Sequence, residues 1–212
     1  MTKIATVSSL ALFALLIFGC KKGNDSKYIK EEFENFYALQ SRNWVITNNS
    51  DPSGVAAWLP GYYGTDKSGQ PYGFPAYSYK KEKTEYLYVG FAGYSGVQGV
   101  QVSSWVISPE VEITNNSSVS FYIHGTNWTG DKLEVRMNET DNSAYVGTTP
   151  QDVGKFTKLL KEITAPAMMW SRVDIKFSDL TASKLSRIAF RYVPDVSASK
   201  GLGIDVFEFK SK

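Results

Sequence analysis

The stretch Ser104-Trp105-Val106-Ile107-Ser108-Pro109 is a bulky apolar run that ends at a proline. Apolar residues return at Val111 and Ile113, and the turn-prone segment Asn115-Asn116-Ser117-Ser118 follows them. The chain then continues as Val119-Ser120-Phe121-Tyr122-Ile123-His124, in which every odd-numbered residue is apolar. Because successive side chains of a strand point to opposite faces, this pattern predicts a half-buried antiparallel strand reached through a turn.

Similar alternation recurs along the rest of the chain, and no window of helical length shows a 3.6-residue period. The alternating segments are residues 132–137, 170–177, 188–192 and 203–209, and a further strand is predicted near residues 86–90. Residues 138–153 are polar and are predicted to form a loop. With an opening strand predicted at Phe33–Phe36, roughly nine short strands separated by turn signals indicate an all-β, two-sheet antiparallel sandwich. The first and last strands are expected to pair as neighbours, as they do in jelly rolls.

Composition excludes several classes of function. The chain has 212 residues with 23 basic and 21 acidic side chains, and its formal charge of +2 includes no basic run longer than Lys80-Lys81, which argues against nucleic-acid binding. Cys20 is the only cysteine, so the chain can form neither an internal disulfide nor a cysteine-based zinc site. His124 is the only histidine, which excludes chemistry that needs two imidazoles.

The first twenty residues indicate export. Lys3 is followed by an uncharged span from Ile4 to Gly19 that is shorter than the roughly 20 residues of a membrane-spanning helix. The segment Ile17-Phe18-Gly19-Cys20 resembles a bacterial lipobox, in which the cysteine receives lipid, including palmitate, and becomes the new N-terminus. The alternative is an ordinary signal peptide with an incidental cysteine.

These observations divide the chain into three parts. Residues 1–19 are expected to be a lipoprotein signal peptide, residues 20–29 a lipidated Cys20 with a flexible tether, and residues 30–212 a jelly-roll domain. The predicted location is the cell envelope, anchored by lipid. Outer-membrane, periplasmic and surface-exposed placements all remain open.

The order of motifs resembles that of the cleaved-adhesin or choice-of-anchor J domain family, which is common in secreted and surface proteins of Bacteroidetes. The resemblance spans about residues 31–209 and is carried by Phe33-Glu34-Asn35, Trp44, Trp58, Ser104–Pro109, Val119-Ser120-Phe121, Trp170–Ile175, Ile188–Arg191 and Ile204-Asp205-Val206. It implies a jelly-roll sandwich, like those of MAM domains and carbohydrate-binding modules, with adhesive roles toward carbohydrate or protein. Some members of the family bind structural calcium.

Structural calcium is therefore one expectation, since calcium needs six to eight oxygen ligands. Glu34 on the predicted first strand and Asp205 on the last would lie side by side if those strands pair. Asp51 is a further candidate, although its loop, Asn49-Ser50-Asp51-Pro52, departs from the acidic, glycine-containing loop of many family members. Alternatively, these carboxylates are only exposed or hydrogen-bonded.

Exposed aromatic residues are the candidates for ligand binding, because sugars stack their C–H faces on aromatic rings and binding residues concentrate in loops. The candidates are Tyr62, Tyr63, Tyr72, Tyr77, Tyr79 and Trp128. Alternatively, these rings fill the core or cover the sheets.

A catalytic role has little support. Glu110 and Glu112 are expected to share one strand face, about 7 Å apart, a spacing that suits a pair of glycosidase carboxylates. Two solvated acids are the simpler interpretation, and His124 has no neighbouring nucleophile or base in the sequence.

We therefore expect a non-catalytic, extracytoplasmic binding module for glycan or protein ligands. The alternative is a structural accessory lipoprotein that packs against a larger envelope complex, and the third option is a carbohydrate-active enzyme. An open aromatic cleft would favour the first, a broad apolar patch the second, and two carboxylates facing each other across a groove the third.

Overall fold

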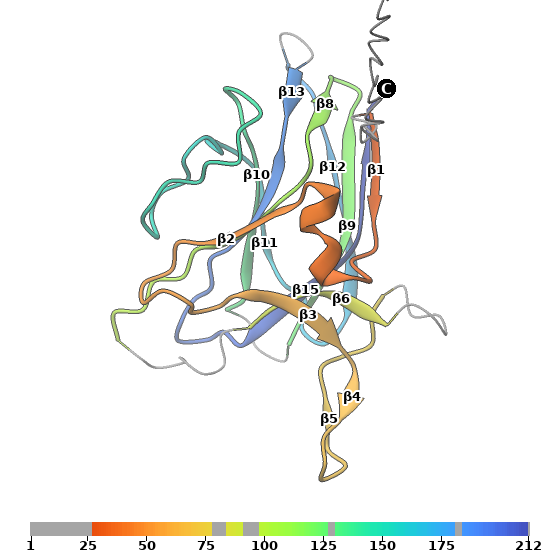
Figure 1. The fold of residues 1–212 in the computed structure, drawn as a ribbon, viewed down its shortest axis with the longest axis vertical. Coiled ribbons are helices and arrows are strands. Elements are labelled where there is room, and N and C mark those ends of the chain that lie inside the picture. Colours follow the sequence, from red (N-terminus) through yellow and green to blue (C-terminus); the bar gives the residue numbers. More distant parts are fainter. Residues whose placement is uncertain (1–26, 78–83, 91–97, 127–129, 181–183, 212) are drawn as a thin grey trace, which may run out of the picture.

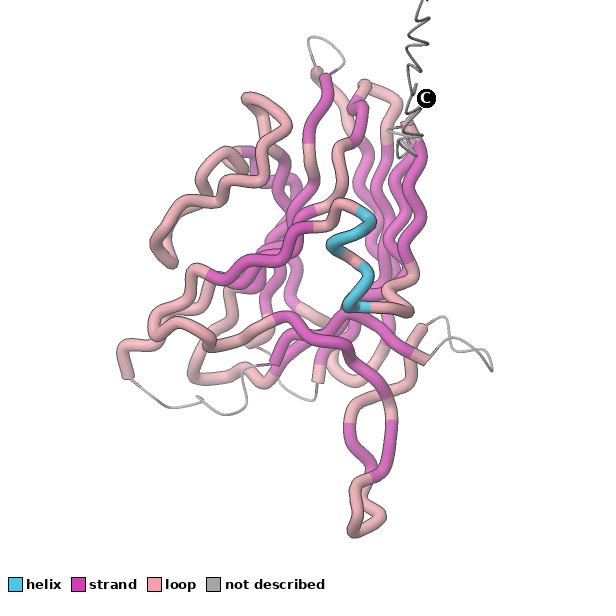
Figure 2. Tube along the Cα trace, in the orientation of Figure 1, coloured by secondary structure: helices cyan, strands magenta, loops and turns pink. Residues whose placement is uncertain are grey.

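A computed structural model describes residues 27–77, 84–90, 98–126, 130–180 and 184–211. Within these ranges the regular structure is almost entirely antiparallel β-strand, and the helical segments are two short 3-10 turns, η1 (Phe36–Ala38) and η2 (Gln40–Arg42) (Figure 2). Three residues of the sequence predictions lie outside the described residues: Cys20, which is predicted to carry the lipid, Tyr79 and Trp128.

The strands form two large sheets (Figure 1). Sheet A contains, in spatial order, β12 (Trp170–Lys176), β9 (Ser118–Gly125), β15 (Gly201–Lys210), β6 (Glu85–Gly90) and β3 (Trp58–Tyr62), with β1 (Tyr28–Glu31) also paired to β15. Sheet B contains β11 (Lys158–Thr164), β10 (Lys132–Met137), β14 (Ile188–Tyr192), β7 (Ser104–Ile107) and β2 (Val45–Asn48). Two further pairs join β8 (Val111–Ile113) to β13 (Lys184–Ser186), and β4 (Gly64–Thr65) to β5 (Pro71–Tyr72). The predicted all-β, two-sheet antiparallel sandwich is confirmed.

Aromatic rings from the two sheets meet in the core between them. Phe190 of β14 contacts Phe121 of β9 and Phe207 of β15, with ring centroids 4.8 and 5.9 Å apart. Trp44, which precedes β2, packs edge-on against Phe207 at 5.2 Å. Full burial of an apolar side chain of this size contributes about 1.5–3 kcal/mol relative to exposure, so these rings contribute strongly to holding the sheets together.

Strand β7 is buried on both faces. It lies between β14 and β2 in sheet B, and all four of its side chains are buried. Val106 belongs to the core between the sheets, whereas Trp105 and Ile107 belong to a second apolar cluster on the outer face. Hence the run of bulky residues does not alternate with polar ones, as expected for a strand covered on both sides.

The segment between β10 and β11 provides the cover for that outer face. Residues 138–157 are mostly irregular, in agreement with the predicted loop, but Val146 and Phe156 pack with Trp105 and Ile107. The ring centroids of Trp105 and Phe156 are 5.9 Å apart. The loop therefore adds a third layer to the sandwich.

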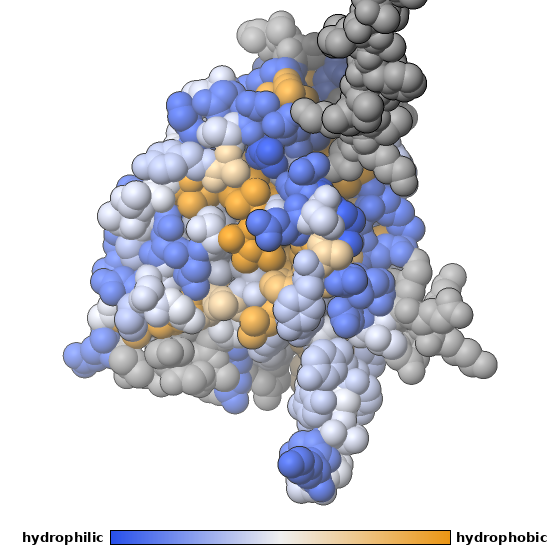
Figure 3. All heavy atoms as spheres, viewed as in Figure 1, coloured by the Kyte–Doolittle hydropathy of each residue, from blue (hydrophilic) through white to orange (hydrophobic). Residues whose placement is uncertain are grey.

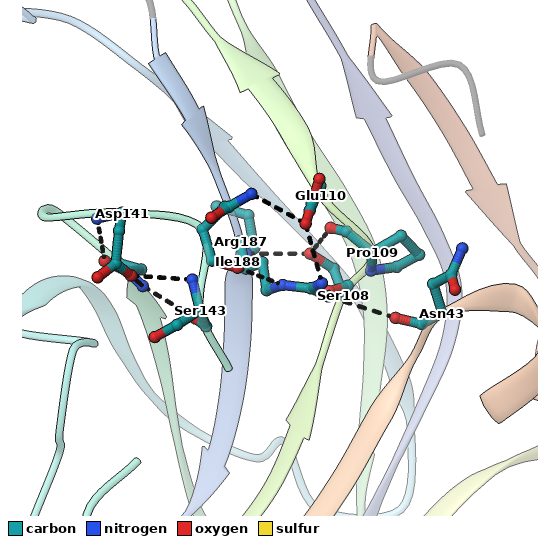
Figure 4. Close-up of polar contacts among 10 residues, drawn as sticks. Asn43, Ser108, Pro109, Glu110, Asp141, Ser143, Arg187 and Ile188 are labelled. Atoms are coloured by element: carbon teal, nitrogen blue, oxygen red, sulfur yellow. Dashed lines mark hydrogen bonds and ion pairs between the residues drawn. The ribbon is translucent and has the colours of Figure 1, made fainter. Parts of the chain in front are cut away.

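Ser108 and Pro109 form the corner where the chain leaves sheet B (Figure 4). The Ser108 hydroxyl donates to the Pro109 carbonyl at 2.8 Å and accepts from the Ile188 N–H at 3.0 Å. Arg187 donates to the Ser108 carbonyl at 2.8 Å and lies 3.4 Å from a Glu110 carboxylate oxygen. Proline has no N–H with which to continue the ladder, and these side chains fix the turn that follows.

The first and last strands are neighbours, as predicted, because β1 pairs with the end of β15 and places Tyr28 opposite Lys210. The first strand begins earlier than expected, however. Tyr28 and Ile29 belong to the sandwich, although the sequence analysis assigned both residues to the tether.

The strand predicted at Phe33–Phe36 is wrong. Phe33 has a positive φ of 56°, and its N–H donates to the Glu31 carboxylate at 2.9 Å. Asn35 caps η1 by accepting from the Ala38 N–H at 3.1 Å. These side-chain hydrogen bonds turn the backbone in a segment that composition alone suggested was extended.

Two features lie at opposite ends of the molecule in Figure 1. The start of β1 and the C-terminal end of β15 lie together at one end, and the β4–β5 hairpin projects from the other. Of the described residues, none belongs to a helix that is long and apolar enough to span a membrane.

Candidate functional site

A row of directly paired residues crosses the outer face of sheet A. In strand order from β3 to β12, the row is Leu59, Tyr88, Gly203, His124 and Trp170. The flanking residues point into the core, so these five positions share the opposite face. Glycine at the centre leaves a gap between Tyr88 and His124.

Phe74 lies over that gap. Its ring stacks on His124 with a centroid distance of 3.8 Å and on Tyr86 with a distance of 4.4 Å. A methyl group on Gly203 would lie 2.9 Å from the Phe74 ring and 2.8 Å from the Tyr86 ring. The absence of a side chain at position 203 therefore allows these rings to lie flat on the sheet.

The segment that carries Phe74 is fixed to sheet A on both sides. The Trp170 indole N–H donates to the Pro75 carbonyl at 2.8 Å, and Tyr77 stacks on Tyr122 with centroids 3.4 Å apart. Gly73 has a φ of 67°, and a Cβ atom there would clash with the Tyr62 carbonyl. The turn at residue 73 brings the β4–β5 hairpin beside the aromatic row.

A pocket of about 440 Å³ opens between this hairpin and the sheet. Tyr62 and Tyr72 form its outer wall, with rings edge to face at 5.6 Å and exposed fractions of 48% and 43%. Phe74, Tyr86 and Tyr88 line its inner part. His124, Thr126 and Met168 complete the lining on the side of β9 and β12.

A buried carboxylate supports this last side. Asp131 accepts hydrogen bonds from the Tyr192 hydroxyl at 2.6 Å and from the Gly201 N–H at 2.8 Å, and the Thr126 hydroxyl lies 3.5 Å from it. Burial raises the pKa of the Asp131 carboxyl, although these hydrogen bonds oppose the shift. Asp131 thereby connects the β9–β10 turn to the start of β15.

Among the described residues that line the pocket, none is acidic and none carries a lysine or arginine side chain. Burial lowers the pKa of His124, and the backbone of Gly125 beside the imidazole offsets only part of that effect. Burial also raises the pKa of the Tyr86 and Tyr88 hydroxyls. At neutral pH the described part of the lining is therefore uncharged and aromatic, and it supplies hydroxyl and imidazole groups.

The predicted ligand residues fall into three groups. Tyr62 and Tyr72 line the pocket, whereas Tyr77 lies beside it on Tyr122. Tyr63 is 52% exposed but does not line the pocket. Tyr79 and Trp128 lie outside the described residues, so their placement stays a prediction.

Sequence reasoning missed the inner part of the pocket. The sequence offers no chemical partner for His124, and it places Tyr86 and Tyr88 on a strand without indicating that they line a site. Tyr86 and Tyr88 are two residues apart, which indicates that they share one face of a strand. That they lie near His124 follows only from the strand order, in which β15 lies between β6 and β9.

The three carboxylates predicted to hold calcium have separate surroundings. Glu34 is not on a strand, and it accepts from the N–H of Thr84 at 2.9 Å. Asp205 is buried in β15 and accepts from the adjacent Val206 N–H at 2.8 Å, whereas Asp51 is exposed and bridges to Gln101. In the part of the chain that the structure describes, no three acidic, histidine or cysteine side chains are grouped to hold a metal ion, and calcium binding stays a prediction.

The two glutamates considered for catalysis have separate partners. Glu110 precedes β8 and interacts with Arg187 and Asn142, with oxygen–nitrogen distances of 3.4 and 3.0 Å. Glu112 lies within β8 and is 4.0 Å from the Lys27 ammonium group. They do not share a strand as predicted, because β8 begins after Glu110.

No protein-family model matches the chain, and no curated protein matches its sequence. The fold is similar to solved cleaved adhesin domains of Lys-gingipain. The K1 domain from Porphyromonas gingivalis has a TM-score of 0.60 at 19% identity, with 87% of this chain and 98% of that domain covered. The K3 domain from the same organism has a TM-score of 0.55 at 14% identity, with the same coverages. The K2 domain has a TM-score of 0.54 at 16% identity, over 87% of this chain and 99% of that domain.

These structural similarities confirm the fold that the motif order implied. At such low identity the likeness concerns the fold alone. The function therefore has to be argued from the pocket.

Proposed function

We propose that this protein is a non-catalytic glycan-binding module held in the cell envelope by a lipid anchor. The observation that carries the proposal is the uncharged aromatic pocket between the β4–β5 hairpin and sheet A. Its volume of about 440 Å³ falls within the range of roughly 300–1,000 Å³ that is usual for ligand sites.

The exposed wall of the pocket suits a sugar ring. Tyr62 and Tyr72 present rings that are about half exposed, and the C–H faces of a pyranose can stack on such rings. Their hydroxyl groups and that of Thr126 can form hydrogen bonds with sugar hydroxyls. The rings are held by strands and by a hairpin, so little order would be lost on binding.

The position of the pocket is consistent with a tether. Figure 1 places the start of β1 at the end of the molecule opposite the β4–β5 hairpin. A chain anchored through Cys20 and entering the domain at Lys27 would therefore present the hairpin away from the membrane. Incorporation of radiolabelled palmitate into the wild-type protein but not into Cys20→Ser tests the anchor, and equal labelling of both would refute it.

Loss of the tyrosine wall should abolish glycan binding. We expect the double substitution Tyr62→Ala and Tyr72→Ala to lower affinity for any bound glycan by about tenfold or more, because the stacking surface is removed. Binding is measured with the purified full-length protein on an array of neutral and acidic glycans, followed by titration calorimetry of the hits.

Tyr63→Ala is the matched control, since Tyr63 is equally exposed on the same segment but does not line the pocket. Its affinity should equal that of the wild-type protein. An array with no bound glycan would refute the proposed function, as would equal losses in the two variants.

A second surface favours the alternative of packing against a partner protein. An apolar groove of about 430 Å³ lies between η1, η2 and β2, and it includes Phe36, Trp44 and the 85%-exposed Tyr37. Figure 3 shows hydrophobic residues gathered over the middle of the face that carries these elements. Retention of the protein in an envelope complex that Tyr37→Ser releases, with no glycan binding, would support this candidate over the first.

A further inference from the structure

We infer that the pocket is selective for uncharged sugars and that His124 is the residue that recognises a sugar hydroxyl. This inference rests on the proposed glycan-binding function. The inference adds the chemical class of the ligand, uncharged sugars. It also makes His124, for which the sequence suggested no function, a residue that determines specificity.

The position of His124 is unusual for a polar side chain. It is only 8% exposed, and its imidazole ring is stacked on Phe74 at 3.8 Å with Trp170 edge-on at 5.1 Å. Its Nδ1 atom is buried and has no hydrogen-bond partner among the described residues. Buried polar atoms without a partner are rare in native proteins, because each costs about 1–3 kcal/mol, and they are frequently completed by a ligand or water.

A ligand in the pocket can supply that partner. His124 is part of the pocket lining, so a bound molecule can approach its imidazole ring. Nδ1 is closed off from solvent, but a half-turn of the ring about the Cβ–Cγ bond exchanges its two edges. That half-turn preserves the ring plane and therefore the stacking on Phe74.

A hydroxyl group is the chemical match for this imidazole. The ring is neutral at neutral pH, so one nitrogen donates and the other accepts, and a hydroxyl can pair with either of them. A carboxylate can only accept, and it would enter a desolvated pocket in which no described lining residue is a lysine or arginine. Sugars whose hydroxyls are uncharged should therefore bind, and uronic acids should be rejected.

Matched sugar pairs test the selectivity in the wild-type protein. The probes are oligosaccharides that end in glucose or galactose and the same chains ending in glucuronic or galacturonic acid, which differ only at C6. Calorimetry should show binding of at least one neutral chain and affinity about tenfold or more lower for its acidic counterpart.

His124→Phe tests the role of the imidazole, since phenylalanine keeps a planar ring on Phe74 but has no nitrogen. We expect affinity for the neutral sugar to fall about tenfold, as for one lost hydrogen bond, while the melting temperature is unchanged or higher because the unpaired buried atom is gone. A merely structural histidine would instead lower the melting temperature and leave the affinity of the folded protein unchanged.

The outcomes separate the two proposals. If the wild-type protein binds no sugar of either kind, the proposed function and this inference both fail. If it binds neutral sugars but binds the acidic counterparts equally well, or if His124→Phe binds as tightly as wild type, glycan binding stands and this inference is overturned.

Discussion

At the scale of single residues, cross-strand rows decide what each face of the sandwich does. On the outer face of sheet B, Glu134, Arg191 and Trp105 are directly paired across β10, β14 and β7. The Arg191 guanidinium lies 5.2 Å from the Trp105 ring centroid and 3.1 Å from Glu134. The side chains of this row pair with one another and leave no gap between them. The row on sheet A instead contains Gly203, which leaves a gap, and His124, whose Nδ1 has no partner among the described residues. The pocket lies on that face.

The residue whose loss should most affect the sheet B row is Glu134. Its carboxylate accepts from Arg136 at 2.7 Å and from Arg191 at 3.1 Å, and these side chains are only 8–13% exposed. Glu134→Gln leaves two mostly buried cations without their anion. We expect the free energy of unfolding in urea at pH 7 to fall by about 3 kcal/mol.

The pH dependence of that loss follows from the pKa of Glu134. Burial raises this pKa, but the hydrogen bonds and charges of Arg136 and Arg191 outweigh burial and hold it below its ordinary value of 4.5. The carboxylate therefore stabilises the fold fully above that value and loses its contribution as the pH falls through the folded-state pKa. The difference in free energy of unfolding between wild type and Glu134→Gln should therefore become smaller as the pH falls. Glu139→Gln, at an exposed position, is the control, and its free energy of unfolding should equal that of wild type at each pH. A difference that is constant with pH would contradict this assignment.

At the scale of elements, periodicity predicted strands well and irregular segments poorly. The segments near β6, β9, β10, β12, β14 and β15 were predicted because alternation and turn residues are local properties of the sequence. The segment over Trp105 could be predicted to be a loop. Its packing could not, because Val146 and Phe156 are well separated in the sequence and follow no periodic pattern of apolar residues. The segment Phe33–Phe36 shows the opposite case, since its aromatic residues suggested a strand that side-chain hydrogen bonds prevent.

The covering loop should contribute to stability through one residue. Phe156 is fully buried against Trp105, so Phe156→Ala removes its burial and leaves a cavity. We expect the free energy of unfolding in urea to fall by about 3–5 kcal/mol. Tyr145→Ala, at a 55%-exposed position in the same loop, should change it by less than about 0.5 kcal/mol. Similar effects of the two substitutions would show that the loop does not form a third layer.

At the scale of the whole molecule, the arrangement of the sheets creates the site. The sequence indicated exposed tyrosines, and two of them, Tyr62 and Tyr72, line the pocket. Tyr86 and Tyr88 of β6 and His124 of β9 also line it, and these two strands are separated in space by the last strand of the chain. Without the order of the strands, no local pattern links Tyr88 to His124, so this part of the site could not be predicted from the sequence.

The same arrangement separates the two candidate binding surfaces. The aromatic pocket lies beside the hairpin at the end opposite the start of β1, and the apolar groove lies between η1, η2 and β2. A small hydroxylated ligand suits the first surface, whereas a protein partner suits the second.

The most direct measurement is a crystal structure of the protein grown with a neutral oligosaccharide that it binds. Our account predicts one sugar ring against Tyr62 or Tyr72, with a hydroxyl of that sugar within hydrogen-bond distance of the His124 imidazole. A sugar bound only in the groove beside η1, or on any surface away from the aromatic pocket, would contradict it.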